Sequence, residues 1–421
     1  MPGAEKSSSH GGSRRARASE TIKRDLRTGR PLWADSIGRS VPHAPLREPI
    51  EVDVAIVGAG ISGAFMAREL SSDFSVVVVD RRGPVLGSTM ASTAMLQWEL
   101  DLPLTALAEK IGEGDATRVY RRSAAAVADL VAIVRRERLR CGLKTKNSLY
   151  LAGDQFGSRA LHREADARAA IGLQSIYLGA AELRERFGLD RTGAILSEGS
   201  ASADPACLAA GLLRRAASRG ARIFAPVQVS EVLQGETHIG LVTDAGVELR
   251  ARHVVFCCGY EFPKGVPTEG AKIVSTWALA SKPLTNAPAW LRRHLVWEAS
   301  DPYLYFRTTA AGRLIVGGED EASSRRHADP GLLAPKAKAI IRKISALVPG
   351  LEVDADYAWS GAFGESTTSM PLIGAIPGMP RAHAVMGFGG NGITYSVIAS
   401  QIVGAAIRGR ADIDAELYAF R

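Results

Sequence analysis

The sequence has few cysteines, and they do not form a metal or redox motif. Its 421 residues include only Cys141, Cys207, Cys257 and Cys258. None shows metal-ligand or C-x-x-C spacing. The adjacent Cys257 and Cys258 lie in an apolar stretch, where we expect reduced, buried thiols rather than a disulfide. These features predict a cytoplasmic protein without a metal site.

The sequence also lacks long apolar runs. None approaches the roughly 18–20 residues that cross a bilayer, and the N-terminal region lacks the apolar core of a secretory signal. We therefore expect no transmembrane segment. Apolar residues make up 46% of the chain and charged residues 23%, which is typical of a globular protein. The length exceeds that of a typical single core, so two domains are expected.

The chain has fewer acidic than basic residues, and the excess of basic residues lies mostly near the N-terminus. The formal net charge is +8, and residues 1–50 hold ten Lys or Arg against five acids. The basic character therefore belongs mostly to the N-terminal region. We interpret residues 1–30 as a disordered basic tail. Targeting or nucleic-acid contact is the alternative, but no nucleic-acid motif follows, and no nucleic-acid partner is expected.

The first half of the chain alternates between strand and helix patterns. Near-continuous apolar runs at 52–57 and 74–80 predict buried parallel strands, with a helix over 61–71 between them. Asp204 and Pro205 are typical of a helix start. The other expected elements are a mostly helical 103–140, a strand-rich segment from 147, an antiparallel meander that ends at 253–258, strands at 272–282, 302–308 and 312–318, an amphipathic helix from 332, and a final helix after a glycine-rich turn.

Three glycines between the first strand and helix have a spacing that suits a dinucleotide. Gly58 permits a tight turn, Gly60 allows a pyrophosphate to approach the backbone, and Gly63 allows close helix packing. The helix N-terminus presents free N–H groups to the phosphates. Asp80 ends the second strand, 22 residues after Gly58, where it can accept hydrogen bonds from ribose hydroxyls. Because the basic residues Arg81 and Arg82 follow Asp80, a cofactor with a 2′-phosphate on its ribose is a minor alternative.

The motif alone does not separate FAD from NAD, but segments spread over residues 50–410 do. In order they are "VDVAIVGAGISGAFMARELSSDFSVVVVD", "GSTMASTAMLQ", "ASADPACLAAGLLRRAASRGARIF", "VVFCCGYE", "YLYFRTTAAGRLIVGGED", "WSGAFGESTTSMPLIG" and "GFGGNGIT". In these segments the chain resembles the D-amino-acid-oxidase and glycine-oxidase-like family of FAD-dependent oxidoreductases. That family includes sarcosine oxidases and gamma-glutamylputrescine-type amine oxidases.

The resemblance implies an α/β fold in two parts. One is a discontinuous Rossmann-like (GR2-type) FAD-binding domain, expected at 31–100, 195–265 and 355–421. The other is a substrate-binding domain on an antiparallel sheet, expected at 101–194 and 266–354. The implied reaction is hydride loss from the carbon next to an amine nitrogen, followed by hydrolysis of the imine. The implied partners are a small amine or amino acid and O₂ or another electron acceptor.

The expected FAD contacts combine the glycine motif with polar residues of the resembling segments. They are Gly58, Gly60, Ile61, Ser62, Gly63, Asp80, Arg81, Ser88, Thr89, Ser92, Thr93, Val229, Gly259, Gly389, Gly390, Asn391, Gly392 and Thr394. Relatives with covalent flavin attach it to a His in the region of 87–95 or to a Cys after the W-x-G strand, and this chain has neither. Non-covalent FAD is therefore expected.

The candidate catalytic and substrate residues lie on later strands. Tyr303, Tyr305 and Arg307 alternate and should share one strand face. Arg307 could hold a substrate carboxylate in a bidentate contact. Lys272 could favour reaction with O₂ near the flavin. A surface position is the alternative for both basic residues.

The W-x-G segment departs from the pattern of small-amino-acid oxidases. Those enzymes carry an Arg two or three residues after the glycine, but Phe363 and its neighbours occupy that space here. A glycine-like substrate is therefore in doubt, and an amine, an N-methyl compound or a bulkier amino acid becomes comparably plausible. Trp359 and Phe363 would then supply apolar or cation-binding walls, with core packing as the alternative.

Two other functions remain open from the sequence. One is an FAD-dependent hydroxyacid dehydrogenase or monooxygenase on a similar fold. The other is an electron-transfer flavoprotein subunit without its own substrate chemistry. The C-terminal half of the chain favours amine or amino-acid oxidation over both.

Overall fold

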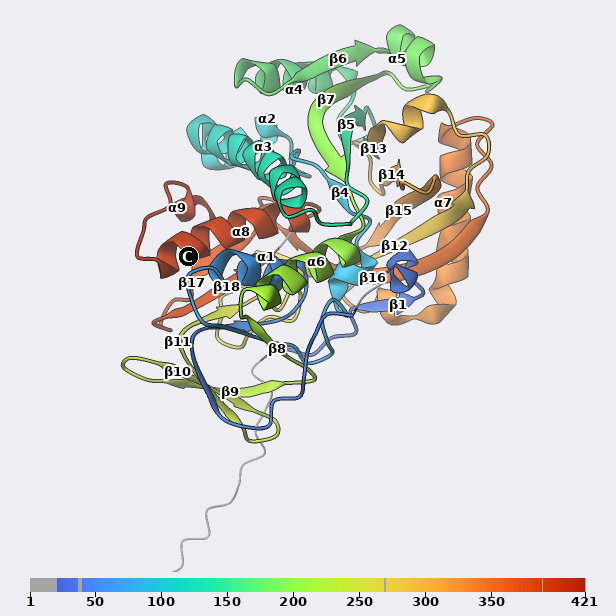
Figure 1. Ribbon diagram of the computed structural model, residues 1–421. Coiled ribbons are helices and arrows are strands. Elements are labelled where there is room, and N and C mark those ends of the chain that lie inside the picture. The colour runs from blue at the N-terminus through green and yellow to red at the C-terminus, as the bar shows by residue number, and fades with distance from the viewer. Residues whose placement is uncertain (1–20, 37–39, 269, 388, 421) are drawn as a thin grey trace, which may run out of the picture.

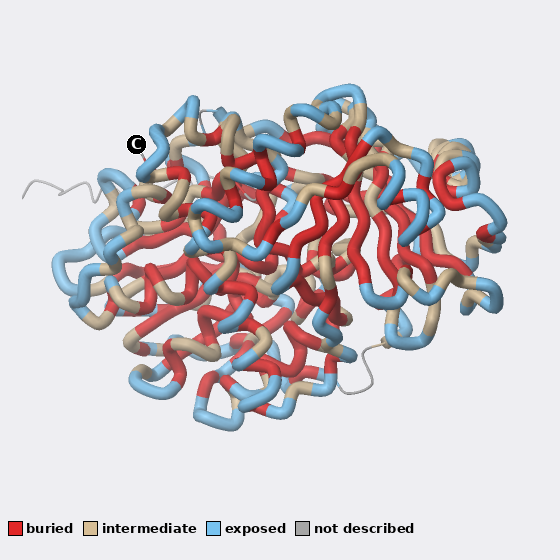
Figure 2. Tube along the Cα trace, turned by 90° about the horizontal axis from the view of Figure 1, so that it is seen from above, coloured by how far each residue is buried: buried red, intermediate tan, exposed pale blue. Residues whose placement is uncertain are grey.

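The computed structural model of the protein describes residues 21–36, 40–268, 270–387 and 389–420. Its strands form two sheets, one largely parallel and one largely antiparallel (Figure 1). Figure 2 shows buried residues along the strands of both sheets, with exposed loops around them. In the described ranges, no helix is long and apolar enough to cross a membrane.

The first sheet has the doubly wound form that the glycine motif predicts. Its order is β17-β18-β11-β2-β3-β8, with β9 and β10 joined to β11. All neighbours from β18 to β8 are parallel. The bounds are β2 Ile50–Val57, β3 Val76–Val79, β8 Arg222–Phe224, β9 Val229–Gln234, β10 Ile239–Thr243, β11 Glu248–Phe256, β17 Leu372–Ala375 and β18 Ala382–Met386.

Helices cover one face of this sheet, and the β9–β10 hairpin lies on the opposite side (Figure 1). They are α1 (Ile61–Leu70), α6 (Pro205–Ser218) and α8 (Gly392–Ile407). The N-terminus of α6 is capped as expected, since Asp204 accepts a hydrogen bond of 2.9 Å from the N–H of Cys207. The four valines of β3 are all buried, which suits a parallel strand covered on both faces.

The second sheet is antiparallel except where β13 runs parallel to β5. Its order is β1-β16-β12-β15-β14-β13-β5-β7-β4, with β6 joined to β7. The bounds are β1 Arg27–Gly29, β4 Met95–Leu96, β5 Lys144–Leu151, β6 Ser175–Gly179, β7 Gly193–Ser202, β12 Ala271–Pro283, β13 His294–Glu298, β14 Leu304–Thr308, β15 Arg313–Glu321 and β16 Ala355–Ser366. Helix α7 (Leu333–Leu347) packs against β12, β15 and β16.

Several expected boundaries are wrong. Strand β16 and most of β7 were expected in the FAD-binding part but belong to the antiparallel sheet. Helices α2 (Leu104–Ile111) and α3 (Glu113–Arg136) were expected in the substrate part, but α3 packs on α8. The strand-rich segment from 147 contains helices α4 (Ser158–Ala170) and α5 (Ala180–Phe187). An apolar pattern identifies an element but not the sheet that it joins.

The expected disordered tail is also wrong over residues 21–30, while 1–20 lie outside the described residues. β1 pairs with β16, and Leu26 is buried. The N–H of Arg24 donates to Glu261 at 2.8 Å, and its Nε donates to the carbonyl of Tyr260 at 3.1 Å. Backbone hydrogen bonds and contacts with charged groups therefore hold this segment in place, although it has no periodic pattern of apolar residues.

Candidate active site

A long cavity begins where the strands of the parallel sheet end. The carboxyl ends of β2, β3 and β11 bring Gly58, Asp80 and Gly259 to one edge, the usual ligand position in such sheets. The cavity encloses about 1800 Å³ of empty space, part of it open to solvent. It continues onto β12, β13, β14 and β16 of the antiparallel sheet.

The glycine motif has the geometry that a pyrophosphate needs. Gly58 has φ +113°, and a Cβ there would lie 2.3 Å from the carbonyl oxygen of Cys257. At Gly63, a Cβ would lie 1.8 Å from the carbonyl oxygen of Gly58. A Cβ at Gly60 would have only the hydroxyl oxygen of Thr89 within 4 Å, at a distance of 3.1 Å. Gly58 and Gly63 therefore shape the turn, whereas Gly60 keeps the backbone open to the cavity.

Asp80 organises the loop beside this motif. One carboxylate oxygen accepts from the N–H of Ala59 at 2.8 Å. The other accepts from the N–H groups of Arg82 and Gly83 at 2.8 and 2.9 Å. Asp80 also lines the cavity. It is therefore held rigidly where an adenosine ribose would lie in such a fold.

An arginine pair and the N-terminal arm close this end of the cavity. Arg82 makes a bidentate contact with Glu261, at 2.6 and 2.7 Å. Arg81 lies 3.6 Å from Glu261 and donates to the hydroxyl of Thr21. Thr21 and Leu26 both line the cavity. The arm, residues 21–36, is thus part of the site, which sequence reasoning missed because it lacks apolar periodicity.

Most expected FAD contacts line the cavity. These are Gly58, Gly60, Ile61, Ser62, Asp80, Arg81, Ser88, Thr89, Ser92, Thr93, Val229, Gly259, Gly389, Gly390, Asn391 and Gly392. Gly63 and Thr394 do not. Thr394 instead donates to the carbonyl of Gln97 at 2.9 Å, and the amide of Asn391 donates to the carbonyl of Glu99. These two side chains therefore hold the backbone at Gln97 and Glu99.

Buried polar atoms without hydrogen-bond partners are spread along the cavity. They include Arg81 Nη1, Ser88 Oγ, Gln97 Oε1 and Thr276 Oγ1, all on lining residues. Buried polar groups are normally paired, so these atoms indicate a polar ligand that spans the cavity. Together with the open backbone at Gly60, they fit a dinucleotide such as FAD.

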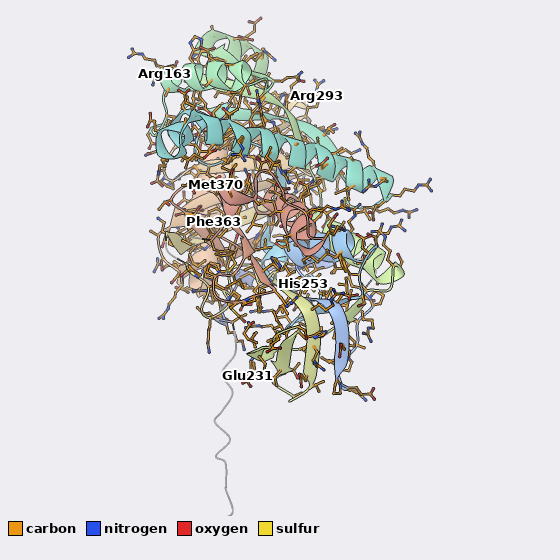
Figure 3. All side chains as sticks on the ribbon, turned by 90° about the vertical axis from the view of Figure 1, so that its left-hand side faces the viewer. Arg163, Glu231, His253, Arg293, Phe363 and Met370 are labelled. Carbon is orange, nitrogen blue, oxygen red and sulfur yellow. The ribbon has the colours of Figure 1, made fainter. Side chains whose placement is uncertain are left out.

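The far end of the cavity, which we call the sheet end, is aromatic and acidic. Its walls include Asp101, Trp297, Tyr303, Tyr305 and Phe363. Figure 3 shows Phe363 in the middle of the molecule, between the levels of α3 and of His253 on β11. Trp359 also lines the cavity, and its indole donates to the carbonyl of Ala91 at 2.8 Å.

The aromatic walls are fixed by close packing. Trp297 stacks on Tyr150 with ring centroids 3.7 Å apart, and its Nε1 donates to Ser148 at 3.1 Å. Tyr303 and Tyr305 have centroids 5.3 Å apart. The Tyr305 ring lies over Gly317, where a Cβ would be 2.3 Å from its Cζ. A substituted residue at 317 would therefore displace Tyr305.

Arg307 does not line the cavity, although the regular register of β14 places it on the same strand face as Tyr305. Its side chain is 2% exposed and turns into the interior. Nε donates to the carbonyl of Thr93 at 2.6 Å, Nη2 to that of Ala203 at 2.8 Å, and Nη1 to that of Thr308 at 3.4 Å. These backbone carbonyls hold the guanidinium in place. The structure therefore assigns Arg307 to packing, not to substrate.

Lys272 is also not brought to the large cavity. Its side chain is 66% exposed, and Nζ lies 3.1 Å from a carboxylate oxygen of Glu365. Both residues line a separate depression that shares Asp101 and Gly389 with the cavity. The sequence predicted the strand, and the exposed side chain corresponds to the surface alternative for Lys272.

Two carboxyl groups, Asp101 in the cavity lining and Asp320 beside the lining residues Thr276 and Tyr303, were missed by sequence reasoning. Asp101 is an exposed residue of the cavity lining and accepts from the N–H of Gly390 at 2.7 Å. Burial raises the pKa of Asp320 to about 6, against opposing effects of Thr276 and Tyr303. Asp320 Oδ1 is buried without a hydrogen-bond partner. An isolated acid in a loop or at a strand end carries no sequence signal.

A β-bulge in β15 includes Asp320, whose side chain lies next to Thr276 and Tyr303. Ser275 opposes Glu321 and Trp277 opposes Gly318, so β15 has an extra residue there. Glu319 has φ +60° and pairs with Lys336 and Lys343 of α7 on the other face. Bulges often redirect side chains next to active sites. Among the described residues, no group of three or more His, Cys, Asp or Glu could hold a metal.

Comparisons with known proteins point to one family. A family model described as FAD dependent oxidoreductase matches residues 53–406. The chain is 23% identical to the gamma-glutamylputrescine oxidoreductase of Escherichia coli, over 90% of this chain and 89% of that protein. It is 24% identical to the glycine oxidase of Geobacillus kaustophilus, over 83% of this chain and 91% of that protein.

Solved structures share the fold. A crystal structure of glycine oxidase from Geobacillus kaustophilus has a TM-score of 0.75 at 21% identity, covering 88% of this chain and 99% of that one. L-proline dehydrogenase from P. horikoshii has a TM-score of 0.72 at 18% identity, with coverage of 88% and 97%. These similarities confirm the expected fold, in which a Rossmann-like part is combined with an antiparallel sheet.

Proposed function

Since this chain belongs to the family of FAD-dependent oxidoreductases, we propose that it binds FAD non-covalently and oxidises a C–N bond of an amine or amino acid. The observation that carries the proposal is the single cavity. It joins the Gly60 turn and Asp80 to an aromatic end on a second sheet. This arrangement suits an enzyme with its own substrate better than an electron-transfer subunit.

The cavity residues divide according to what they would hold. Gly60 and the N-terminus of α1 suit the pyrophosphate. Asp80 and Val229 suit the adenosine, and the turn at Gly389–Gly392 suits the flavin. When bound, FAD supplies the acceptor for the hydride that leaves the carbon next to nitrogen. Neither a His in 87–95 nor a Cys in 359–374 is present to attach it.

The protein's own contribution is orientation and exclusion of water. Trp297, Tyr303 and Tyr305 form rigid walls, because each ring is held by a neighbouring ring or hydrogen bond. A fixed substrate needs less ordering on the way to the transition state. The reaction requires an uncharged amine at the moment of hydride loss, so no dedicated base need contact the carbon.

The test is anaerobic reduction of the purified holoenzyme by a panel of amines, amino acids and 2-hydroxy acids. We expect loss of oxidised-flavin absorbance with a nitrogen compound, together with a carbonyl product and ammonia or a smaller amine. Reduction by hydroxy acids alone would favour the dehydrogenase alternative. Acid precipitation should release all flavin into the supernatant, and flavin left in the pellet would refute non-covalent binding.

A further inference from the structure

The backbone carbonyls of residues 91–93 are all held by side chains that lie far away in the sequence. Trp359 on β16 donates its Nε1–H to the first carbonyl at 2.8 Å. Trp33 in the N-terminal arm donates its Nε1–H to the second at 2.7 Å. Arg307 on β14 donates from Nε to the third at 2.6 Å. Because residues 91–93 all line the cavity, three distant elements fix one stretch of its wall.

This stretch needs such donors because it has little regular structure of its own. Helix η2 (Ser88–Ala91) ends where the stretch begins, and β4 starts only at Met95. A backbone carbonyl inside a protein requires a donor, and here side chains supply it instead of a neighbouring strand. The next residue, Ala94, is buried and has φ +50°. A residue with a Cβ keeps this left-handed conformation only where its surroundings enforce it, often at a ligand site.

The three donors are buried and connected with one another. The guanidinium carbon of Arg307 lies 5.5 Å from the centre of the Trp33 ring. Strand β1 pairs with β16 so that Gly29 is opposite Trp359 (Figure 1). Trp33 follows directly in the short helix η1 (Leu32–Asp35). The pairing of β1 with β16 therefore brings the two tryptophans to neighbouring segments.

Trp33 belongs to a part of the chain that the family model does not match. The match covers residues 53–406, which include the other two donors but not the arm. The hydroxyl of Tyr357 on β16 donates to Asp35 at 2.9 Å, which ties the arm to β16 beside Trp33. The arm therefore supplies a contact to the cavity wall that the matched part of the chain does not provide.

The held stretch connects the two sheets along the cavity. On one side, the N–H of Ile61 at the start of α1 donates to the hydroxyl oxygen of Thr89 at 2.9 Å, where the pyrophosphate would bind. On the other side, β4 begins and pairs with β7 of the antiparallel sheet. A movement of residues 91–93 would therefore change the wall between the nucleotide end and the sheet end.

We propose that Trp33, Trp359 and Arg307 are positioning residues for FAD, which hold residues 91–93 in the conformation that encloses the cofactor. This rests on the proposed binding of FAD and assigns the N-terminal arm a role in slowing its release. Trp33 and Arg307 do not line the cavity. Each of them acts through the backbone carbonyl that it holds.

The test replaces each tryptophan with phenylalanine in the purified holoenzyme. Trp33→Phe and Trp359→Phe keep a buried aromatic ring but remove the N–H donor. Release of FAD after dilution, followed by flavin fluorescence, should be about 3- to 10-fold faster in each variant. The visible circular dichroism of the bound flavin should also change, because it depends on how the wall holds the cofactor. Trp33→Phe is the more stringent variant, since this side chain lies outside the cavity lining.

The matched control is Trp290→Phe in η3 (Ala289–Arg292). Trp290 is partly buried against Phe187 and does not line the cavity, so its variant should keep the wild-type release rate and dichroism. A lower melting temperature of Trp33→Phe with both flavin signals unchanged would show a merely structural role and overturn this inference, while FAD binding would stand. Equal acceleration of release in Trp290→Phe would overturn it too. Wild-type protein purified without flavin would overturn the proposed function itself.

Discussion

Replacing Arg307 with Met separates a packing role from substrate binding. The change removes two short hydrogen bonds from a charged donor, to the carbonyls of Thr93 and Ala203. Such bonds contribute about 1.5–3 kcal/mol each. Burial lowers the pKa of Arg307 to about 9, so the guanidinium is charged at neutral pH. Relief from burying this charge offsets part of the loss, and we expect a net destabilisation of about 2–4 kcal/mol.

The assay pairs the melting temperature with kinetics on the same samples. Thr93 lies in the segment that lines the cavity, so some flavin should also be lost. Per bound flavin, kcat/KM for an amine should change by no more than about threefold. Arg307→Lys should recover part of the stability, because an ammonium cannot copy the planar fork. An unchanged melting temperature with a loss of kcat/KM above about 30-fold would refute this reasoning and restore Arg307 as a substrate residue.

Gly60→Val should abolish FAD binding, because a branched side chain would fill the open space beside the turn that the pyrophosphate needs; a normal flavin content would show that the turn is not the pyrophosphate site. Deleting residues 1–20 should preserve flavin content, whereas deleting 1–30 should speed FAD release by about tenfold, because Thr21, Leu26 and the Arg24–Glu261 contact are lost; equal release rates would exclude the arm from the site. Asp320→Asn should raise the free energy of unfolding at pH 8 by about 1–3 kcal/mol. The folded-state pKa of about 6 exceeds the unfolded value, so the wild type loses stability as pH rises from about 4 through 6; a constant difference between the two proteins from pH 4 to 8 would contradict this.

The nucleotide part of the site could be predicted because its residues act through local backbone geometry. Gly58, Gly60 and Gly63 have conformational and steric roles that depend on a few neighbouring residues. Asp80 follows a strand whose parallel direction was readable from its valines. Sixteen of the eighteen expected FAD contacts, all but Gly63 and Thr394, accordingly line one cavity.

The sheet end could not be predicted to the same depth because it depends on long-range packing. Alternation placed Tyr305 and Arg307 on one strand face, but it could not show that the carbonyls of Thr93 and Ala203 hold the Arg307 guanidinium. Asp320 depends on a bulge in β15. A bulge changes the face of every later residue, and no residue type in "VGGEDE" determines it.

The most direct test of the account is one anaerobic titration of wild type and Gly60→Val, side by side, with an amine. The account predicts that purified wild type shows oxidised-flavin absorbance, that the amine removes it, and that Gly60→Val shows neither. Flavin in the wild type that stays oxidised with every amine and amino acid would contradict the account, as would flavin reduction of equal extent in the variant.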